Sequence, residues 1–196
     1  MEYRRFPKGE SVVSTFEFHE HRERARHLEE GAHRDRLIMA RDLVAQFCSG
    51  RHMTFVADLG CGDGGLLQLL GEMPTINAHG YDFAPANAAG WTERNVEAYA
   101  LDFVNELHFV PYVDLYVLTE VLEHLEDPYG LLVSLRERKG ALVCSSPWIE
   151  HEGSIDGCHN WAWDVEGYTA MLSACGFNVI RSEKVSWSQV HLAVPK

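Results

Sequence analysis

The sequence lacks the long apolar runs of membrane proteins. No uninterrupted apolar stretch approaches the roughly 20 residues that a helix needs to span a bilayer. The first residues, Met-Glu-Tyr-Arg-Arg-Phe-Pro, do not lead into the apolar segment of a secretory signal. These absences predict a cytoplasmic protein with no membrane partner.

Paired cysteines are also lacking. The 5 cysteines are odd in number and scattered, and no two of them form a Cys-x-x-Cys pair. The pattern therefore indicates neither a disulfide framework nor a zinc site built from cysteines.

Basic charge is scarce over most of the chain. The formal net charge is −12, with ten Lys or Arg against nine acids in residues 1–51 and seven against twenty in residues 52–196. Proteins that bind nucleic acid usually present a basic face. The composition therefore argues against long nucleic acids as substrates.

The 196 residues, 46% of them hydrophobic, suffice for one domain with a sizeable core. We predict a single domain, with residues 1–50 as an N-terminal helical segment and residues 53–196 as the core. Helical spacing extends over residues 16–30 and, after a break at Gly31, over residues 37–47.

Strand-like and helix-like segments then alternate. The expected strands are residues 55–57, 76–81, 96–101, 113–118, 141–144, 178–185 and 190–194, and the expected helices start at Leu66, Pro128 and Val165. This order predicts an α/β fold with a doubly wound, seven-stranded, mainly parallel sheet and an antiparallel last strand.

The most informative motif is a glycine-rich turn after the first of these strands. It extends from Asp58 to Gly65 and includes Gly60 and Gly62, so a ligand can approach bare backbone there. Asp82 lies 22 positions after Gly60, at the end of the next strand, which suits a carboxylate that accepts hydrogen bonds from ribose hydroxyls.

The glycine spacing alone also fits a dinucleotide site or a tight turn without a ligand. A dinucleotide would place its pyrophosphate at this turn and helix N-terminus, where Asp58 and Asp63 would repel it. S-adenosylmethionine carries an ammonium and a sulfonium but no phosphate, so the same acids would attract it. Cys61 lies between two of the glycines and is interpreted as a small pocket-lining side chain rather than a nucleophile.

An acid followed by alternating glycines, at Asp58, Gly60, Gly62 and Gly64, resembles the first motif of the class I S-adenosylmethionine-dependent methyltransferases. By element order, the resemblance extends from residue 55 to the C-terminus and implies a Rossmann-like fold with S-adenosylmethionine as cofactor.

The resemblance also implies roles at the tips of the following strands. Asp82 would hold the ribose, Phe83 would pack on adenine and Asp102 would accept the adenine amino group, with Phe103 and Thr119 beside them. Alternatively, the two phenylalanines are core aromatics and Asp102 is a helix cap.

The fourth strand runs into Glu120-Val-Leu-Glu123-His124. On a helical turn these three side chains share one face and would suit a divalent cation such as Mg²⁺, with His159 or His151 completing the shell.

This motif resembles the O-methyltransferases of ubiquinone biosynthesis and the ribose O-methyltransferases of small-RNA ends, in which it binds a metal that orients or deprotonates the accepting hydroxyl. Two alternatives stay open. His124 faces the substrate without a metal, as a general base, or Glu123 and His124 simply pair at a helix start.

Residues 147–163 are rich in Gly, His and Trp and are expected to wall the acceptor pocket. Trp161 and Trp163 either stack on a planar acceptor or belong to the core. The histidines at 19, 21, 27 and 33 are either substrate-side residues or exposed helix residues. Neither an Asn-Pro-Pro-Tyr motif after the fourth strand nor a Pro-Cys pair is present, which disfavours DNA amino-methylation and cytosine C5 methylation.

The sequence therefore predicts an S-adenosylmethionine-dependent methyltransferase that acts on an oxygen, less readily a nitrogen, of a small molecule. The alternatives are a ribose O-methyltransferase of small-RNA ends and a catalytically idle S-adenosylmethionine-binding partner subunit.

Overall fold

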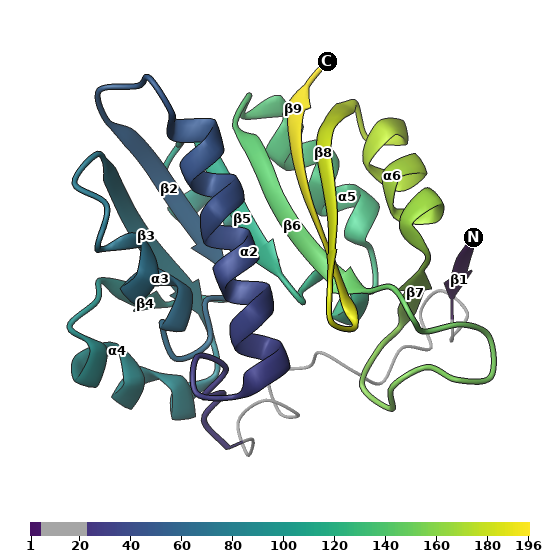
Figure 1. Cartoon of the computed structure of the whole chain (residues 1–196), viewed down its shortest axis with the longest axis horizontal. Coiled ribbons are helices and arrows are strands. Elements are labelled where there is room, and N and C mark those ends of the chain that lie inside the picture. Colours follow the sequence, from purple (N-terminus) through teal and green to yellow (C-terminus); the bar gives the residue numbers. More distant parts are fainter. Residues whose placement is uncertain (5–22) are drawn as a thin grey trace.

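The structure is a computed structural model that describes residues 1–4 and 23–196. A seven-stranded sheet forms its centre, with helices on both faces (Figure 1). The strands follow the order β4-β3-β2-β5-β6-β9-β8 across the sheet. They span Thr54–Leu59 (β2), Ile76–Asp82 (β3), Ala98–Ala100 (β4), Leu115–Thr119 (β5), Ala141–Pro147 (β6), Phe177–Val185 (β8) and Ser188–Pro195 (β9).

Strands β2 to β6 pair in parallel, whereas β9 runs antiparallel to both of its neighbours, β6 and β8. The predicted seven-stranded, mainly parallel sheet with an antiparallel last strand is therefore confirmed. All residues of β5 and β6 are buried, as expected for parallel strands that are covered on both faces.

Two apolar clusters lie on opposite faces of the sheet. Along β5, Leu115 and Val117 belong to one cluster and Tyr116 and Leu118 to the other, because successive side chains of a strand point to opposite faces. Helices α2 and α3 pack in the first cluster, and α5 and α6 pack in the second. The helices span Gly31–Cys48 (α2), Gly65–Leu70 (α3), Ala88–Arg94 (α4), Pro128–Glu137 (α5) and Val165–Ala174 (α6).

Short-range chemistry sets the helix starts. Asp127 accepts a hydrogen bond from the Gly130 amide at the start of α5, and Asp164 accepts one from Gly167 at the start of α6. Both are N-caps that satisfy a free amide of the first turn. Three short 3₁₀ turns connect other elements: Pro85–Asn87 (η1), Leu107–Phe109 (η2) and Leu122–His124 (η3). In the part of the chain that the structure describes, no helix combines the length and the apolar character required to cross a bilayer.

The helix predicted over residues 16–30 is wrong where it can be examined. Residues 23–26 have no regular structure and residues 27–29 form a turn. Side-chain contacts replace helical hydrogen bonds here, since the amide of Ala25 donates to Asn87 Oδ1 and Arg24 pairs with Asp63. Residues 16–22, with His19 and His21, lie outside the described residues.

A second, two-stranded sheet was not predicted. Strand β1 (Glu2–Arg4) pairs antiparallel with β7 (Trp161–Trp163), and Figure 1 places it at the edge near α6. It ties the chain start to the segment that follows β6.

Strand β2 lies between β3 and β5. The chain leaves β2 towards β3 and β4 on one side and later returns to β5 on the other, so the strand order reverses there. In open parallel sheets this reversal, at the carboxyl ends of the strands, opens a crevice that binds ligands.

Candidate functional site

A cavity of about 880 Å³ lies at this reversal. Its walls come from the glycine-rich turn after β2, the ends of β3 and β5, the start of α2, the segment 147–159, and residues 23–27. Ligand pockets for drug-sized molecules usually measure about 300–1,000 Å³. The cavity therefore has the size of a small-molecule binding pocket.

The glycine turn forms the floor of the cavity. Gly60, Gly62 and Gly64 all have positive φ angles, of 79°, 55° and 84°, a region that side-chain-bearing residues rarely adopt. A Cβ atom at Gly60 would lie 2.6 Å from Cγ2 of Val121. The motif is thus required both for backbone conformation and for close packing against the end of β5.

Asp58 is the acid best placed to attract a cation. Its side chain is buried at the end of β2 and lines the cavity, and its Oδ1 has no hydrogen-bond partner among the described residues. Burial, reinforced by the negative charge of Asp82 and opposed by Arg36, raises the pKa of Asp58 to about 7. A ligand ammonium beside Oδ1 would favour the carboxylate.

Asp63, by contrast, is already neutralised. Its Oδ2 accepts from Arg24 Nε at 3.0 Å and from Arg94 Nη2 at 2.8 Å. The expectation that Asp63 attracts a cationic ligand is therefore wrong, because two arginines from distant segments take up its charge. Asp63 holds the turn in place.

Asp82 connects the tip of β3 to the glycine turn. Its Oδ2 accepts from the Gly62 amide at 2.9 Å, and its Oδ1 accepts from the Ala84 amide and from Asn87 Nδ2 at 2.8 and 3.2 Å. Both oxygens are thus fixed in orientation while the side chain lines the cavity beside Phe83. A carboxylate oxygen can accept two hydrogen bonds, which leaves Oδ2 with capacity for one ribose hydroxyl.

Asp102, Phe103 and Thr119 also line the cavity. The carboxylate of Asp102 accepts from the Val104 amide at 3.2 Å and from Asn105 Nδ2 at 2.7 Å, so it stabilises a local turn. Phe103 is buried and belongs to the core cluster beneath the cavity. The core alternative therefore holds for Phe103, and Asp102 stabilises a turn rather than capping a helix. Their contact with adenine stays a prediction.

Cys61 is buried against the cavity, and burial raises the pKa of its thiol well above the usual range. A neutral thiol is a poor nucleophile. This agrees with its interpretation as a small lining residue.

Glu120 is the strained residue of the site. Its φ angle is 56°, an uncommon conformation without glycine, which persists where surrounding contacts enforce it. Here the Glu120 amide donates to Ser145 Oγ at 3.1 Å, and Ser145 Oγ donates to Glu120 Oε1 at 2.9 Å. Burial raises the pKa of Glu120, an effect that the Arg36 charge opposes.

Glu123 is fully buried on η3. Neither carboxylate oxygen has a hydrogen-bond partner among the described residues, and burial raises the pKa of Glu123 well above its usual range. Glu123 is absent from the cavity lining, whereas Glu120 and His124 belong to it. The three residues therefore do not all present their side chains to the cavity.

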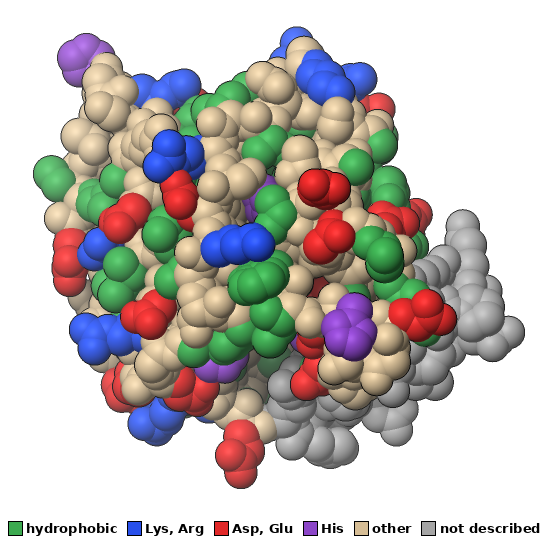
Figure 2. Space-filling model, turned by 45° about the vertical axis from the view of Figure 1, so that its right-hand side comes forward, with side chains coloured by type: hydrophobic (Ala, Val, Ile, Leu, Met, Phe, Trp, Pro, Cys, Tyr) green, Lys and Arg blue, Asp and Glu red, His purple; other side chains and the backbone are tan. Residues whose placement is uncertain are grey.

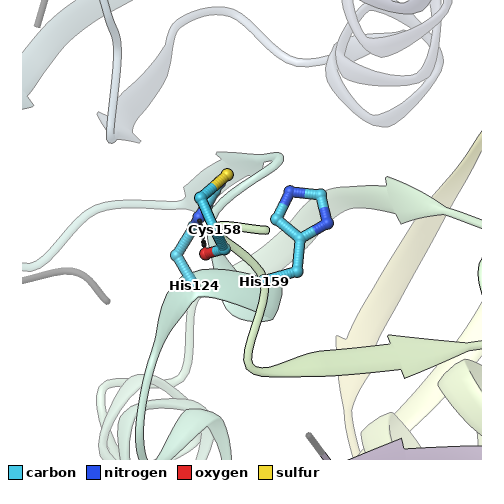
Figure 3. Close-up of side chains that lie close together, drawn as sticks. All are labelled: His124, Cys158 and His159. Carbon is cyan, nitrogen blue, oxygen red and sulfur yellow. Dashed lines mark hydrogen bonds between the residues drawn. The ribbon is translucent and has the colours of Figure 1, made fainter. Parts of the chain in front are cut away.

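His124 instead meets residues from the segment between β6 and β7. One ligand atom each of His124, Cys158 and His159 lie within 4.8 Å of one another (Figure 3). Two predicted metal ligands are thus brought together with a cysteine that was not predicted. His151 is exposed and bonds to the carbonyl of Glu152, outside this group.

The tryptophans of β7 do not face the cavity. Trp161 and Trp163 are buried and stack on each other, with ring centroids 5.7 Å apart. Their indole nitrogens donate to the Leu125 carbonyl and to Glu2. The core alternative therefore holds for both, and the apolar wall of the cavity comes from Trp187 and Ile149 instead.

Arg36 is a site residue that the sequence analysis missed. It is 1% exposed, lines the cavity, and lies 3.7 Å from Glu120 Oε2, in contact with the ring nitrogens of His27 and His33. Its Nε has no partner among the described residues. The sequence signal for Arg36 was its position on the apolar face of α2, beside Leu37 and one turn before Ala40.

Comparison with known proteins identifies the family. Residues 32–182 match a family model described as a methyltransferase domain. A search of curated proteins found no match.

Solved structures share the fold at low identity. Magnesium protoporphyrin IX methyltransferase from Synechocystis PCC 6803, with bound SAM, has a TM-score of 0.67 and 17% identity over 87% of this chain and 88% of that one. The 1,6-didemethyltoxoflavin-N1-methyltransferase of Burkholderia thailandensis, with its substrate and S-adenosylhomocysteine, has a TM-score of 0.67 and 16% identity over 82% and 78%. The [4+2]-cyclase SpnF has a TM-score of 0.65 and 16% identity over 82% and 80%. One fold thus serves different reactions.

Proposed function

Because this chain belongs to the methyltransferase-domain family, we propose that it transfers a methyl group from S-adenosylmethionine to an oxygen, or less readily a nitrogen, of a small metabolite. The observation that carries the proposal is the cavity at the strand reversal. On its donor side lies Asp58, whose Oδ1 has no hydrogen-bond partner in the described part of the chain, and on its acceptor side lies His124.

The donor side is set by the carboxylates at the strand ends. We assign Asp58 to the ammonium of the donor and Asp82 to the ribose hydroxyls, because these acids line the cavity on either side of the glycine turn. Phe83 offers a ring for the adenine and Asp102 an acceptor for its amino group. S-adenosylmethionine, when bound, supplies the methyl group on its sulfonium.

The acceptor side is set by His124. Its Nδ1 lies 3.0 Å from the Cys158 carbonyl, and since a carbonyl only accepts, the proton resides on Nδ1 and the lone pair on Nε2. A neutral imidazole in this tautomer can take a proton from an acceptor hydroxyl in the cavity. Glu120 and Arg36 lie beside it and would orient polar groups of the acceptor.

Charge and cavity shape support a small acceptor over a long nucleic acid. On the face drawn in Figure 2, basic side chains lie in small separate groups among acidic ones. The apolar wall at Trp187 and Ile149 suits a molecule with a planar or apolar body.

Release of bound ligand tests the donor. Mass spectrometry of the purified protein after denaturation should detect S-adenosylmethionine or S-adenosylhomocysteine, and calorimetry should measure binding of added S-adenosylmethionine. Recovery of a nicotinamide dinucleotide instead, with no affinity for S-adenosylmethionine, would refute the proposal.

Transfer is tested with S-adenosylmethionine that carries a deuterated methyl group, incubated with the enzyme and an extract of small metabolites. A product that gains the labelled methyl identifies the acceptor. His124→Ala should lower kcat by about 10²–10⁴-fold and leave S-adenosylmethionine binding unchanged, whereas His108→Ala, at an exposed position outside the cavity, should behave as wild type.

A further inference from the structure

A cluster of soft and borderline metal-ligand groups forms the acceptor end of the cavity. His124 belongs to η3, and Cys158 and His159 belong to the segment between β6 and β7. One ligand atom of each lies within 4.8 Å of the others, and the two imidazole rings meet edge to face with centroids 4.7 Å apart. All three residues line the cavity.

The backbone holds these two segments together. The Asn160 amide donates to the Glu123 carbonyl at 2.7 Å, and Asn160 Nδ2 donates to the His124 carbonyl at 2.7 Å. Asn160 is fully buried. The three side chains therefore start from a fixed framework, which is what a binding site requires from its supporting residues.

Both histidines have the outer partner that metal-bound histidines usually have. His159 Nδ1 lies 2.9 Å from Glu150 Oε2, and His124 Nδ1 lies 3.0 Å from the Cys158 carbonyl. A carboxylate and a carbonyl are acceptors, so each Nδ1 carries the proton and each Nε2 has the lone pair. Carboxylate or carbonyl partners of this kind orient the ring and make it a better ligand.

The cysteine sulfur completes the set. Figure 3 shows the Cys158 sulfur and one ring nitrogen of His159 turned towards the same space. The Cys158 thiol donates to Asp156 Oδ1 at 3.0 Å, and zinc binding would replace this hydrogen bond with a Zn–S bond.

Donor chemistry selects the ion. Magnesium prefers a shell of oxygen ligands, whereas one thiolate with two imidazoles suits zinc. In a tetrahedral zinc site with bonds of about 2.0–2.3 Å, the ligand atoms lie roughly 3.3–3.6 Å apart. The distances between the three ligand atoms would have to shorten by about 1 Å, which small rotations about the side-chain χ angles can supply.

We propose that His124, Cys158 and His159 bind one zinc ion whose fourth coordination position faces the acceptor cavity. Binding breaks the Cys158 S–H bond and forms a Zn–S bond, and the proton leaves to solvent. Three protein ligands with an open position are the arrangement of catalytic rather than structural zinc. The metal ligands thus differ from the Glu120 and Glu123 carboxylates expected from the sequence.

The fourth position defines an acceptor class, an inference that rests on the proposed function. A hydroxyl or thiol of the acceptor would bind the zinc through its oxygen or sulfur and release its proton to solvent in the cavity, because the cation lowers the pKa of a bound group. With zinc present, His124 Nε2 is a ligand, and the ion takes over the role of the base.

Zinc loading of the full chain tests the site directly. The protein is stripped with a chelator, reloaded with Zn²⁺ and desalted, and its zinc is measured by elemental analysis. We expect one zinc per chain for wild type and for two matched controls, His52→Gln at an exposed position and Cys175→Ala in the core away from the cavity. Cys158→Ser and His159→Gln should fall well below one zinc per chain.

Cobalt substitution reports the identity of the ligands spectroscopically. Wild-type protein loaded with Co²⁺ should show a sulfur-to-cobalt charge-transfer band in the near ultraviolet together with the visible bands of tetrahedral cobalt. Cys158→Ser should lose the first, and Glu150→Ala should weaken metal affinity about 10–100-fold, since it removes the outer partner of His159. Circular dichroism confirms that each variant is folded.

Any of three outcomes would overturn the site. Wild type retains no metal after loading, the cobalt spectrum lacks the sulfur band, or Cys158→Ser and His159→Gln retain as much zinc as wild type. Calorimetry with S-adenosylmethionine on the zinc-free protein separates the two proposals. Donor binding without zinc binding refutes only the site, and zinc binding without donor binding refutes only the proposed function.

Discussion

The guanidinium of Arg94 donates to the buried carboxylate of Asp63 at 2.8 Å and so fastens helix α4 to the glycine-rich turn. Arg24 reaches the same oxygen at 3.0 Å from the irregular segment 23–26. The Asp63 side chain is only 1% exposed. One carboxylate therefore joins three segments around the cavity.

Loss of this charge should destabilise the fold. Asp63→Asn removes the buried anion that Arg24 and Arg94 share and leaves these largely buried guanidinium groups with only the exposed carboxylates of Glu93 and Glu29. We expect a decrease of about 3 kcal/mol in the free energy of unfolding. Urea unfolding followed by circular dichroism measures it. Asp42→Asn is the control, because the Asp42 side chain is 53% exposed in its pair with Arg41, and it should cost less than about 1 kcal/mol. Equal effects of the two substitutions would contradict the structural role.

Binding of S-adenosylmethionine should strengthen as pH rises through 7. The pKa of Asp58 is raised to about 7, so the carboxylate that attracts the donor ammonium forms mainly above this pH. Below it, affinity should fall by up to about tenfold per pH unit. Calorimetry between pH 5.5 and 8.5 measures this profile. Asp58→Asn should flatten it, whereas the exposed Asp35→Asn should not.

The same group should affect stability in the absence of ligand. A carboxyl whose pKa is higher in the folded state than its unfolded value of about 3.9 destabilises the fold progressively as pH rises from about 4 to 7. Asp58→Asn should therefore be more stable than wild type at pH 8 and differ little from it at pH 4. Thermal unfolding at the two pH values provides the measurement, and a gain confined to pH 4 would contradict the raised pKa.

Gly60→Ala should damage both the turn and the donor site. The φ angle of 79° and a Cβ placed 2.6 Å from Val121 Cγ2 both oppose the substitution, and we expect a loss of about 2–4 kcal/mol in stability. In the double variant Gly60→Ala/Val121→Ala, the clash is relieved while the φ strain remains. In chemical denaturation, the double variant should lose less unfolding free energy than the sum of the losses of the two single variants. A loss equal to that sum would argue against the clash.

Asp82→Asn should weaken S-adenosylmethionine binding by about 1–3 kcal/mol, because ribose hydroxyls lose a charged acceptor. The amide oxygen still accepts one of the backbone hydrogen bonds that Asp82 makes with Gly62 and Ala84. An analogue of S-adenosylhomocysteine without ribose hydroxyls controls for the turn itself: it should bind both proteins alike. If calorimetry finds Asp82→Asn equal to wild type for the natural ligand, Asp82 does not hold the ribose.

Much of the fold follows from local patterns in the sequence. Apolar runs in β5 and β6, Pro128 at a helix start, and the two consecutive strands at the chain end each reflect interactions between residues close in the sequence. The structure confirms the elements that they predict. Prediction was wrong at residues 23–30, where contacts with Asn87 and Asp63 override helical spacing. Such contacts join residues far apart in the chain, and periodicity does not report them.

The sequence by itself determined the cavity's donor side, because the glycine turn needs positive φ angles and bare backbone at Gly60 and Gly62, a requirement that residue type expresses directly. Only the tertiary structure decided which of the acids at this turn are already paired with arginines. Asp63 pairs with arginines from two other segments, while Asp58 Oδ1 has no hydrogen-bond partner within residues 1–4 and 23–196. Likewise, Cys158 and His159 meet His124 through contacts between segments distant in sequence, among them the hydrogen bond from the buried Asn160 to the His124 carbonyl. Electrostatics and ligand geometry depend on distance in space, which the order of residues along the chain does not contain.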